Sequence, residues 1–293
     1  MVSILIITYG REEELIETLN NINNYNEEII ELLILDNNDT NKLENYIREI
    51  FKENKKIILR YFNEGINYGV ALGRNYLIKK AKGDILITLD DDIEIENINN
   101  LVFKIKKYFR ENTQIGCLAF NIKNYYSRER LRHEIPHGNK KLNFEENLFT
   151  YYYIGAGHAI KKEIYDKCGL YPDDLGKYGG EERDLSFRII ENNYKILYAA
   201  DIIIFHKVSP KGRMSKKIEQ YYRYRNQLIV INRYMPLKYR ISNNFIWSLY
   251  YLLVKNGKIK EVFKVLKECH NINSIESKKI IERIKGLRGR IWF

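Results

Sequence analysis

Short apolar runs that alternate with helix-like segments constrain the fold of this chain most strongly. Three runs have the length and the apolar or β-branched content of buried strands, namely Val2–Thr8, Ile29–Leu35 and Gly83–Asp92, and Lys56–Tyr61 is expected to form a further strand. Between them, apolar residues recur at the spacing of a helix, as at Leu15, Leu19 and Ile22. Strands that alternate with helices form right-handed βαβ units. The sequence therefore predicts an α/β fold with a mostly parallel sheet flanked by helices.

The last of these runs ends in three consecutive acids, Asp90, Asp91 and Asp92. Open α/β sheets bind ligands at the carboxyl ends of their strands. Because alternate residues of a strand point to opposite faces, we expect Asp90 and Asp92 to share one side and Asp91 to take the other. Two carboxylates on one side suit Mg²⁺ or Mn²⁺. Taken alone, however, so short a motif is more often a solvated turn.

The chain continues the same pattern to about residue 210 and then becomes helical. We expect helices over 99–111 and 181–192, strands over 115–120 and 202–205, and two strands around a close backbone approach within 151–160. The polar stretch over 121–149 has the length of a lid or a binding loop. After Pro210 apolar residues recur every three or four positions, so we place a boundary near Lys211.

Composition places the chain among ordinary globular proteins of a reducing compartment. Of its 293 residues, 45% are hydrophobic and 30% are charged. The three cysteines, Cys117, Cys168 and Cys269, have no paired spacing that would indicate zinc or a disulfide framework. The first apolar run is too short for a signal peptide, and no run is long enough to span a bilayer. We therefore expect a cytoplasmic protein.

Positive charge is concentrated in the last third of the chain. The formal net charge is +11, and Lys and Arg dominate from Lys207 onward. Such an excess attracts nucleic acid, anionic lipid or phosphorylated small molecules. The segment Phe245–Val254, flanked by Arg240 and Lys255, fits an interfacial membrane helix, but it fits a core helix equally well because periodicity does not separate the two.

Two common nucleotide-binding signatures are absent from the sequence. The first strand is not followed by Gly-x-Gly-x-x-Gly, and Gly-x-x-x-x-Gly-Lys-Ser/Thr does not occur. A dinucleotide dehydrogenase and a P-loop NTPase therefore lose their main support. If the protein binds phosphate groups, a metal ion together with Arg or Lys must hold them.

Several motifs occur in an order and at intervals that match a known family. They are Ser3-Ile-Leu-Ile-Ile-Thr-Tyr-Gly-Arg11, Leu35-Asp-Asn-Asn-Asp-Thr40, Asn63-x-Gly65, Gly73-Arg74-Asn75, the strand ending in Asp92, Gly179-Gly-Glu-Glu-Arg-Asp-Leu-Ser-Phe-Arg188 and the later His206. Over about residues 2–235 the chain resembles the family 2 glycosyltransferases, enzymes of the GT-A fold that transfer a sugar from a nucleotide donor. The resemblance implies a catalytic domain over 1–210, with a nucleotide-sugar half to about 120 and an acceptor half beyond it. Residues 211–293 would form a basic helical C-terminal region.

The resemblance also implies roles for residues at the ends of the early strands. Thr8, Tyr9 and Arg11 would line the nucleotide pocket, and Arg74 would lie near the diphosphate. Asp36 would accept a hydrogen bond from the base, which suits the imide N–H of uracil or thymine and favours a UDP- or dTDP-sugar. The alternative for Asp36 is a helix cap. The alternative for Arg74 is a solvated charge on a helix.

For the acidic triplet the resemblance implies a metal site. Asp90 and Asp91 would contact the nucleotide sugar, Asp90 would also approach the metal, and Asp92 would bind the Mn²⁺ or Mg²⁺ that bridges the diphosphate. His206 would complete the metal shell, although a lone histidine after a strand is more often structural. Gly157, with Gly155, would allow close approach of sugar or acceptor, and the alternative is a β-bulge.

The catalytic base is the position where the sequence departs from the family. The family pattern is Glu-Asp with the aspartate as base, whereas this chain has Glu181-Glu182. The resemblance implies Glu182 as the base, with Glu181 as second choice. The alternative is that both acids only favour a helix N-terminus. Two further departures are Gly10, where asparagine is commoner, and Asn37, where the family often has a second acid.

These expectations describe a metal-dependent, inverting enzyme that moves a sugar from a nucleoside diphosphate to an acceptor hydroxyl. The acceptor would be a saccharide or a lipid-linked molecule in cell-surface polysaccharide or glycolipid assembly, with the C-terminal helices as a peripheral contact on the inner face of the membrane. A nucleotidyltransferase acting on a sugar phosphate and a basic nucleic-acid-binding protein are the alternatives. Nucleic acid is not the expected partner, because the basic residues lie behind the acidic site in the sequence rather than around it.

Overall fold

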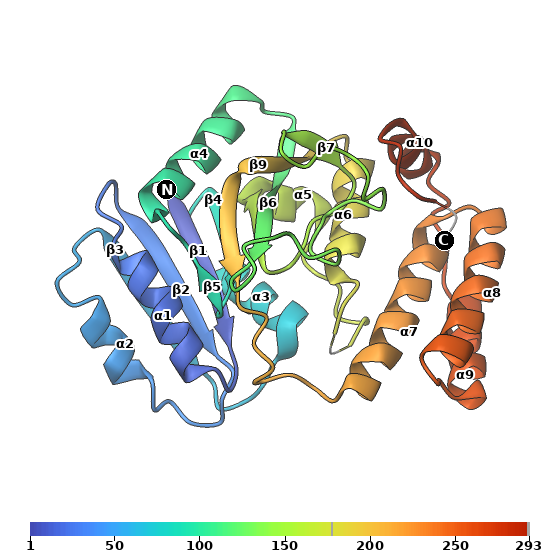
Figure 1. The fold of residues 1–293 in the computed structure, drawn as a ribbon, viewed down its shortest axis with the longest axis horizontal. Helices are drawn as coiled ribbons and strands as arrows, with labels where there is room; N and C mark the ends of the chain where they lie inside the picture. Colours follow the sequence, from blue (N-terminus) through green and yellow to red (C-terminus); the bar gives the residue numbers. More distant parts are fainter. Residues whose placement is uncertain (177, 292–293) are drawn as a thin grey trace.

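A nine-stranded mixed sheet with helices on both faces forms the centre of the molecule (Figure 1). The computed structural model describes residues 1–176 and 178–291. The strands are β1 (Val2–Thr8), β2 (Ile30–Asp36), β3 (Ile57–Asn63), β4 (Ile85–Asp90), β5 (Ile93–Glu94), β6 (Ile115–Asn124), β7 (Leu148–Thr150), β8 (Gly157–Lys161) and β9 (Lys195–His206). The helices are α1 (Glu12–Asn23), α2 (Glu44–Ile50), α3 (Gly69–Lys80), α4 (Ile98–Glu111), α5 (Lys162–Cys168), α6 (Glu181–Glu191), α7 (Lys216–Tyr234), α8 (Leu237–Val254), α9 (Ile259–His270) and α10 (Lys278–Gly286).

The first four long strands form the parallel half of the sheet, in the order β3-β2-β1-β4. After β1, each of β2, β3 and β4 is reached through a helix, which is the βαβ pattern that the sequence predicts. The register pairs Thr8 with Asp36 and Ile7 with Asp90. The carboxyl ends of β1, β2 and β4 therefore meet at one edge, where a parallel sheet binds ligands.

The second half of the sheet is mixed rather than parallel. Strand β8 runs antiparallel to both β4 and β6, while β6 and β9 are parallel to each other. The short strand β5 pairs antiparallel with the end of β9, which sets Ile93 opposite His206. This pairing brings the end of β9 next to the acids that follow β4.

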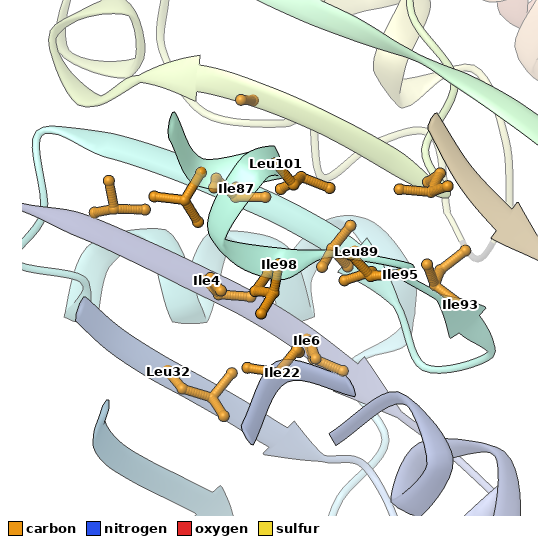
Figure 2. Close-up of a cluster of buried hydrophobic side chains, with 14 of the residues drawn as sticks. Ile4, Ile6, Ile22, Leu32, Ile87, Leu89, Ile93, Ile95, Ile98 and Leu101 are labelled. Carbon is orange, nitrogen blue, oxygen red and sulfur yellow. The ribbon is translucent and has the colours of Figure 1, made fainter. Parts of the chain in front are cut away.

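The core divides into two apolar layers, one on each face of the sheet. Along β1, Ile4 and Ile6 pack with α1, α2 and α4, whereas Leu5 packs with α3, α5 and α6 on the other face. Figure 2 shows the first layer, in which Ile4 and Ile6 lie close to Leu32. Because both faces are covered, the strands are almost continuously apolar. The prediction of buried strands is confirmed for β1, β2 and most of β4, whereas β3 is only partly buried.

Several details of the structure after β4 differ from the sequence prediction. Strand β9 starts at Lys195, whereas the sequence predicted a start at residue 202. The exposed Asp201 interrupts the apolar run, but the strand continues through it, because a register shift against β6 accommodates the extra residues. Strand β6 continues to Asn124, into the segment predicted as a loop. No strand forms over 151–156; aromatic side chains such as the buried Tyr153 give this segment a strand-like pattern without strand pairing. Helices α5 and α10 and strands β5 and β7 were not predicted.

Helices α7–α10 follow the sheet, which confirms the predicted helical C-terminal region, although α10 itself was not predicted. They share an apolar cluster with α6, in which Phe187 packs against Tyr234 at a ring distance of 5.5 Å. Within the described residues, no helix combines enough length and apolarity to cross a membrane.

Candidate active site

The three acids after β4 point in the alternating directions that the sequence predicts. Asp91 is buried and turns toward β1, where it accepts hydrogen bonds from Thr8 Oγ1 and Arg11 Nη1, both at 2.8 Å. Asp90 and Asp92 turn toward His206 instead. Burial raises the pKa of Asp91 to about 6, although the charge of Arg11 opposes the shift. The triplet is therefore part of an internal ionic network and is not a solvated turn.

Asp90, Asp92 and His206 form a cluster with the chemistry of a divalent-cation site. One ligand atom from each lies within 4.8 Å of the others. The Nε2 atom of His206 lies 3.1 Å from Asp92 Oδ1 and 4.0 Å from Asp90 Oδ2. Asp92 is fully buried, and its Oδ2 accepts a hydrogen bond from the N–H of Ser209, whereas its Oδ1 accepts none. A buried carboxylate oxygen without a hydrogen bond, beside a second carboxylate and an imidazole nitrogen, fits Mn²⁺ or Mg²⁺.

Glu134 holds the other side of the His206 ring. Its carboxylate contacts His206 Nδ1, and its side chain is buried. Burial lowers the pKa of His206, but the contacts with Asp92 and Glu134 outweigh that effect and raise it to about 10. A metal-ligating histidine commonly donates its second N–H to a carboxylate, which fixes the ring and its tautomer. The sequence gives no signal for Glu134, because this residue lies in the 121–149 segment, 72 residues from His206, without a motif or a periodic pattern.

Arg74 connects the acidic cluster to the predicted catalytic base. This side chain is almost completely buried; its Nη1 lies 2.8 Å from Glu182 Oε1, and its Nη2 lies 3.7 Å from Asp90 Oδ1. Helix α3 reaches this position because Gly73 packs directly on Ile7 and Leu35. The alternative that Arg74 is a solvated helix charge is wrong.

Glu181 and Glu182 begin helix α6 directly after Gly180, which has a left-handed φ of 94°. Glu182 keeps partial contact with solvent, whereas Glu181 is buried and its Oε1 lies 3.7 Å from Arg74 Nη1. Burial and the nearby charge of Glu182 raise the pKa of Glu181 well above its ordinary value. The pair therefore combines a buried acid, whose pKa is raised, with a more accessible carboxylate that is ion-paired to Arg74.

The other residues that were predicted to contact the nucleotide lie at the same sheet edge. Arg11 donates from Nε to the carbonyl of Lys211 and from Nη2 to that of Ser209, which ties the segment after β9 to the end of β1. Tyr9 is half exposed beside this contact. Asp36 is buried at the end of β2 and accepts hydrogen bonds from the Tyr61 hydroxyl at 2.5 Å and from the N–H of Asn38 at 2.9 Å.

Asp36 does not cap a helix, so the alternative for this residue is wrong. Helix α2 begins at Glu44, and its N-cap residue, Leu43, makes no side-chain capping bond. Asp36 instead forms a local turn with Asn38 and a cross-strand bond to Tyr61. Its carboxylate is fixed at the carboxyl end of β2, level with Thr8.

Gly155 and Gly157 lie in different surroundings. A Cβ on Gly155 would lie 2.2 Å from Glu182 Oε1, so the absence of a side chain there leaves room for the Arg74–Glu182 pair. A Cβ on Gly157 would lie 2.1 Å from Ile204 Cδ1, in the core between β8 and β9. Gly157 pairs in regular register with Leu89, so it is not a bulge. Of the two, Gly155 is the one in contact with the site.

Comparison with known proteins identifies a family for most of the sheet domain. Residues 3–169 match the family model described as "Glycosyl transferase family 2". An uncharacterised protein of Haemophilus influenzae is 55% identical over 172 residues, which is 59% of this chain and 93% of that protein. The match to the family model covers β1 through α5, including the acidic triplet.

Solved structures share the fold at low sequence identity. The mannosyltransferase PcManGT from Pyrobaculum calidifontis, in complex with GDP-Man and Mn²⁺, has a TM-score of 0.60 at 16% identity, over 98% of this chain and 79% of that one. A fragment of TarS from S. aureus, in complex with UDP-GlcNAc, has a TM-score of 0.62 at 16% identity, over 98% of this chain and 83% of that one. The GT-A architecture predicted from the sequence is confirmed.

Proposed function

Because the chain belongs to glycosyl transferase family 2, we propose that it is a metal-dependent, inverting enzyme that moves a sugar from a nucleoside-diphosphate donor to an acceptor hydroxyl. The observation that carries this proposal is the arrangement of Asp90, Asp92 and His206 beside Glu182, with Arg74 in contact with both groups of acids. A donor diphosphate needs a cation and an acceptor needs a base, and this edge of the sheet supplies the residues for both.

Each group has a distinct task in the proposed reaction. Asp92 and His206, with Asp90, would hold the cation, and a cation there would supply positive charge for the departing diphosphate. Glu182 would take the proton of the acceptor hydroxyl as that oxygen attacks the anomeric carbon. Arg74 would hold the Glu182 carboxylate in position and balance the charge of the acids. Glu181 is buried, so an acceptor hydroxyl would reach it less easily than it would reach Glu182.

The donor side of the proposal includes the base and the nucleotide contacts. Thr8, Tyr9 and Arg11 would border the nucleotide, and Asp36 would accept a hydrogen bond from a uracil or thymine imide. The similar solved structures bind UDP-GlcNAc in one case and GDP-Man in another, so they support a nucleotide sugar without choosing a base. We keep UDP- or dTDP-sugars as the favoured donors.

The acceptor side lies with the later part of the chain. We propose that residues 121–210 bind a saccharide or a lipid-linked acceptor, that 1–120 bind the donor, and that 211–293 form the basic helical C-terminal region. The setting would be the assembly of a cell-surface polysaccharide or a glycolipid.

The proposal is tested with nucleotide sugars in the presence and absence of Mn²⁺. We expect thermal stabilisation by one donor only with the metal, and an inverted anomeric configuration in the product by NMR. Asp92→Asn should remove the metal-dependent stabilisation and the transfer, whereas Asp166→Asn, at an exposed position on α5, should change neither. Full turnover by Asp92→Asn would overturn the metal site. Release of pyrophosphate from a nucleoside triphosphate would instead indicate a nucleotidyltransferase.

A further inference from the structure

Helix α8 presents a row of large apolar side chains to solvent. Leu237, Ile241, Phe245, Leu249 and Leu253 follow one another at intervals of four residues, with exposed fractions of 57%, 61%, 69%, 45% and 71%. Residues four apart are neighbours on a helix surface, so these side chains form a continuous row, here called the α8 stripe. Scattered exposed apolar residues are ordinary, but a contiguous patch marks an interaction surface.

The α8 stripe is not the face by which α8 packs on the protein. That face carries Tyr239, Asn243, Ser248 and Tyr251, which are buried. Tyr251 stacks on Tyr224 of α7 at a ring distance of 4.3 Å, and the Tyr224 hydroxyl lies 2.8 Å from Ser248 Oγ. In Figure 1, α8 lies at the edge of the molecule, with α7 between it and the sheet. The packing requirement of α8 is thus met while the stripe remains exposed.

The charged residues close to the α8 stripe in the sequence are mostly basic. Helix α8 contains no Asp or Glu, and exposed lysines occur at Lys238 on α8 and at Lys258, Lys260 and Lys264 around the start of α9. Two further exposed apolar residues, Ile259 and Phe263, lie among these lysines. An apolar helix face bordered by Lys and Arg is the composition of helices that lie in the interface of an anionic bilayer.

We propose that the α8 stripe docks this protein flat on the surface of an anionic membrane, with Phe245 and Leu249 inserted at the level of the headgroups. A second copy of the chain is a poorer occupant, because two such faces would bring their lysines together without acidic partners on α8. The helix does not cross the bilayer, since no described helix is long and apolar enough to do so. The inference is independent of the proposed function, because docking needs neither donor nor acceptor.

Flotation of the whole chain with lipid vesicles tests this proposal. We expect binding to vesicles of phosphatidylcholine mixed with phosphatidylglycerol, little binding to phosphatidylcholine alone, and weaker binding at high salt. The double variant Phe245→Gln/Leu249→Gln should lower the partition coefficient by about tenfold or more, because two inserted apolar groups are lost. The matched control is Phe103→Gln, at an equally exposed position on α4, which should bind as the wild type does.

Two further measurements separate docking from misfolding and from dimerisation. The α8 variants should keep the wild-type melting temperature and donor affinity in solution, and Lys258→Glu/Lys260→Glu should weaken binding to the anionic vesicles. Binding that the double variant retains, or equal binding to neutral vesicles, would overturn the proposal. So would a dimer of the wild type in analytical ultracentrifugation that the double variant abolishes, because a second copy would then cover the stripe.

Discussion

The two sides of the candidate site are built in different ways. On the nucleotide side, Thr8, Asp36 and Asp90 reach their places through the regular register of parallel strands. On the opposite side, Glu182 and His206 come from α6 and from β9, and single side chains, Arg74 and Glu134, hold them against the rest. The first side therefore depends on many backbone hydrogen bonds, whereas the second depends on a few ionic contacts. Substitution of one such contact should affect the second side most.

Removal of Arg74 should have the largest effect on stability and activity, because the Arg74 side chain connects the two sides of the site. In Arg74→Ala the carboxylates of Asp90, Glu181 and Glu182 lose a buried cation. We expect a loss of about 3 kcal/mol in the free energy of unfolding, measured by urea denaturation, together with loss of transfer. Arg48→Ala breaks an exposed ion pair with Glu44 and should cost less than about 1 kcal/mol. Equal losses for the two variants would contradict the central place of Arg74.

Glu182→Gln should leave the nucleotide side intact while it disables the other. The amide can still accept a hydrogen bond from Arg74 but cannot take the acceptor's proton. We expect kcat to fall by about 10²–10⁴-fold with the donor dissociation constant nearly unchanged, measured by steady-state kinetics and calorimetry. Glu182→Asp, which restores the usual family residue, should keep part of the activity. If Glu181→Gln lost more kcat than Glu182→Gln, the base would be Glu181.

The same comparison explains what could be predicted from the sequence. Strand alternation was enough to assign Asp90 and Asp92 to one side and Asp91 to the other, because it is a local property of the backbone. Parallel strands with buried faces are equally local, so the first half of the fold followed from apolar runs. Motif order pointed to Glu182 and His206, but their positions in space depended on the antiparallel β8 and on the β5–β9 pairing, which no local pattern encodes.

Contacts between side chains that are far apart in the sequence could not be predicted from it. Arg74 contacts Glu182 across 108 residues and Glu134 contacts His206 across 72, and neither pair has a fixed spacing. The first part of β9 was not predicted, because a charged residue such as Asp201 normally marks the end of an apolar strand. The bulge that accommodates Asp201 has no signal in the sequence. The exposure of the α8 stripe was equally undetermined, since the same periodicity describes a core helix.

Glu134→Gln should weaken the metal site without dismantling it. Asp90, Asp92 and His206 remain, but the His206 ring loses the carboxylate that orients it. We expect the dissociation constant for Mn²⁺ to rise by about 10–100-fold, measured by calorimetry on the chain without donor. Glu129→Gln, an exposed position in the same segment, serves as the control. An unchanged Mn²⁺ affinity in Glu134→Gln would show that His206 does not need the Glu134 carboxylate to orient its ring.

The smallest expected effect concerns the pH dependence of stability and distinguishes the two glutamates. Burial and the charge of Glu182 raise the pKa of Glu181 in the folded chain above its unfolded value. The folded state therefore binds more protons than the unfolded state between the two pKa values, and stability must fall as pH rises through that window. Glu181→Gln removes the titrating group, so the variant lacks this loss of stability at higher pH. The melting temperature of the variant minus that of the wild type should therefore increase by roughly a few degrees from about pH 5 to about pH 8. Differential scanning calorimetry at both pH values measures the change, with Glu163→Gln on α5 as an exposed control. A temperature difference that is the same at both pH values would mean that Glu181 is ionised in the fold and that both carboxylates share the charge of Arg74.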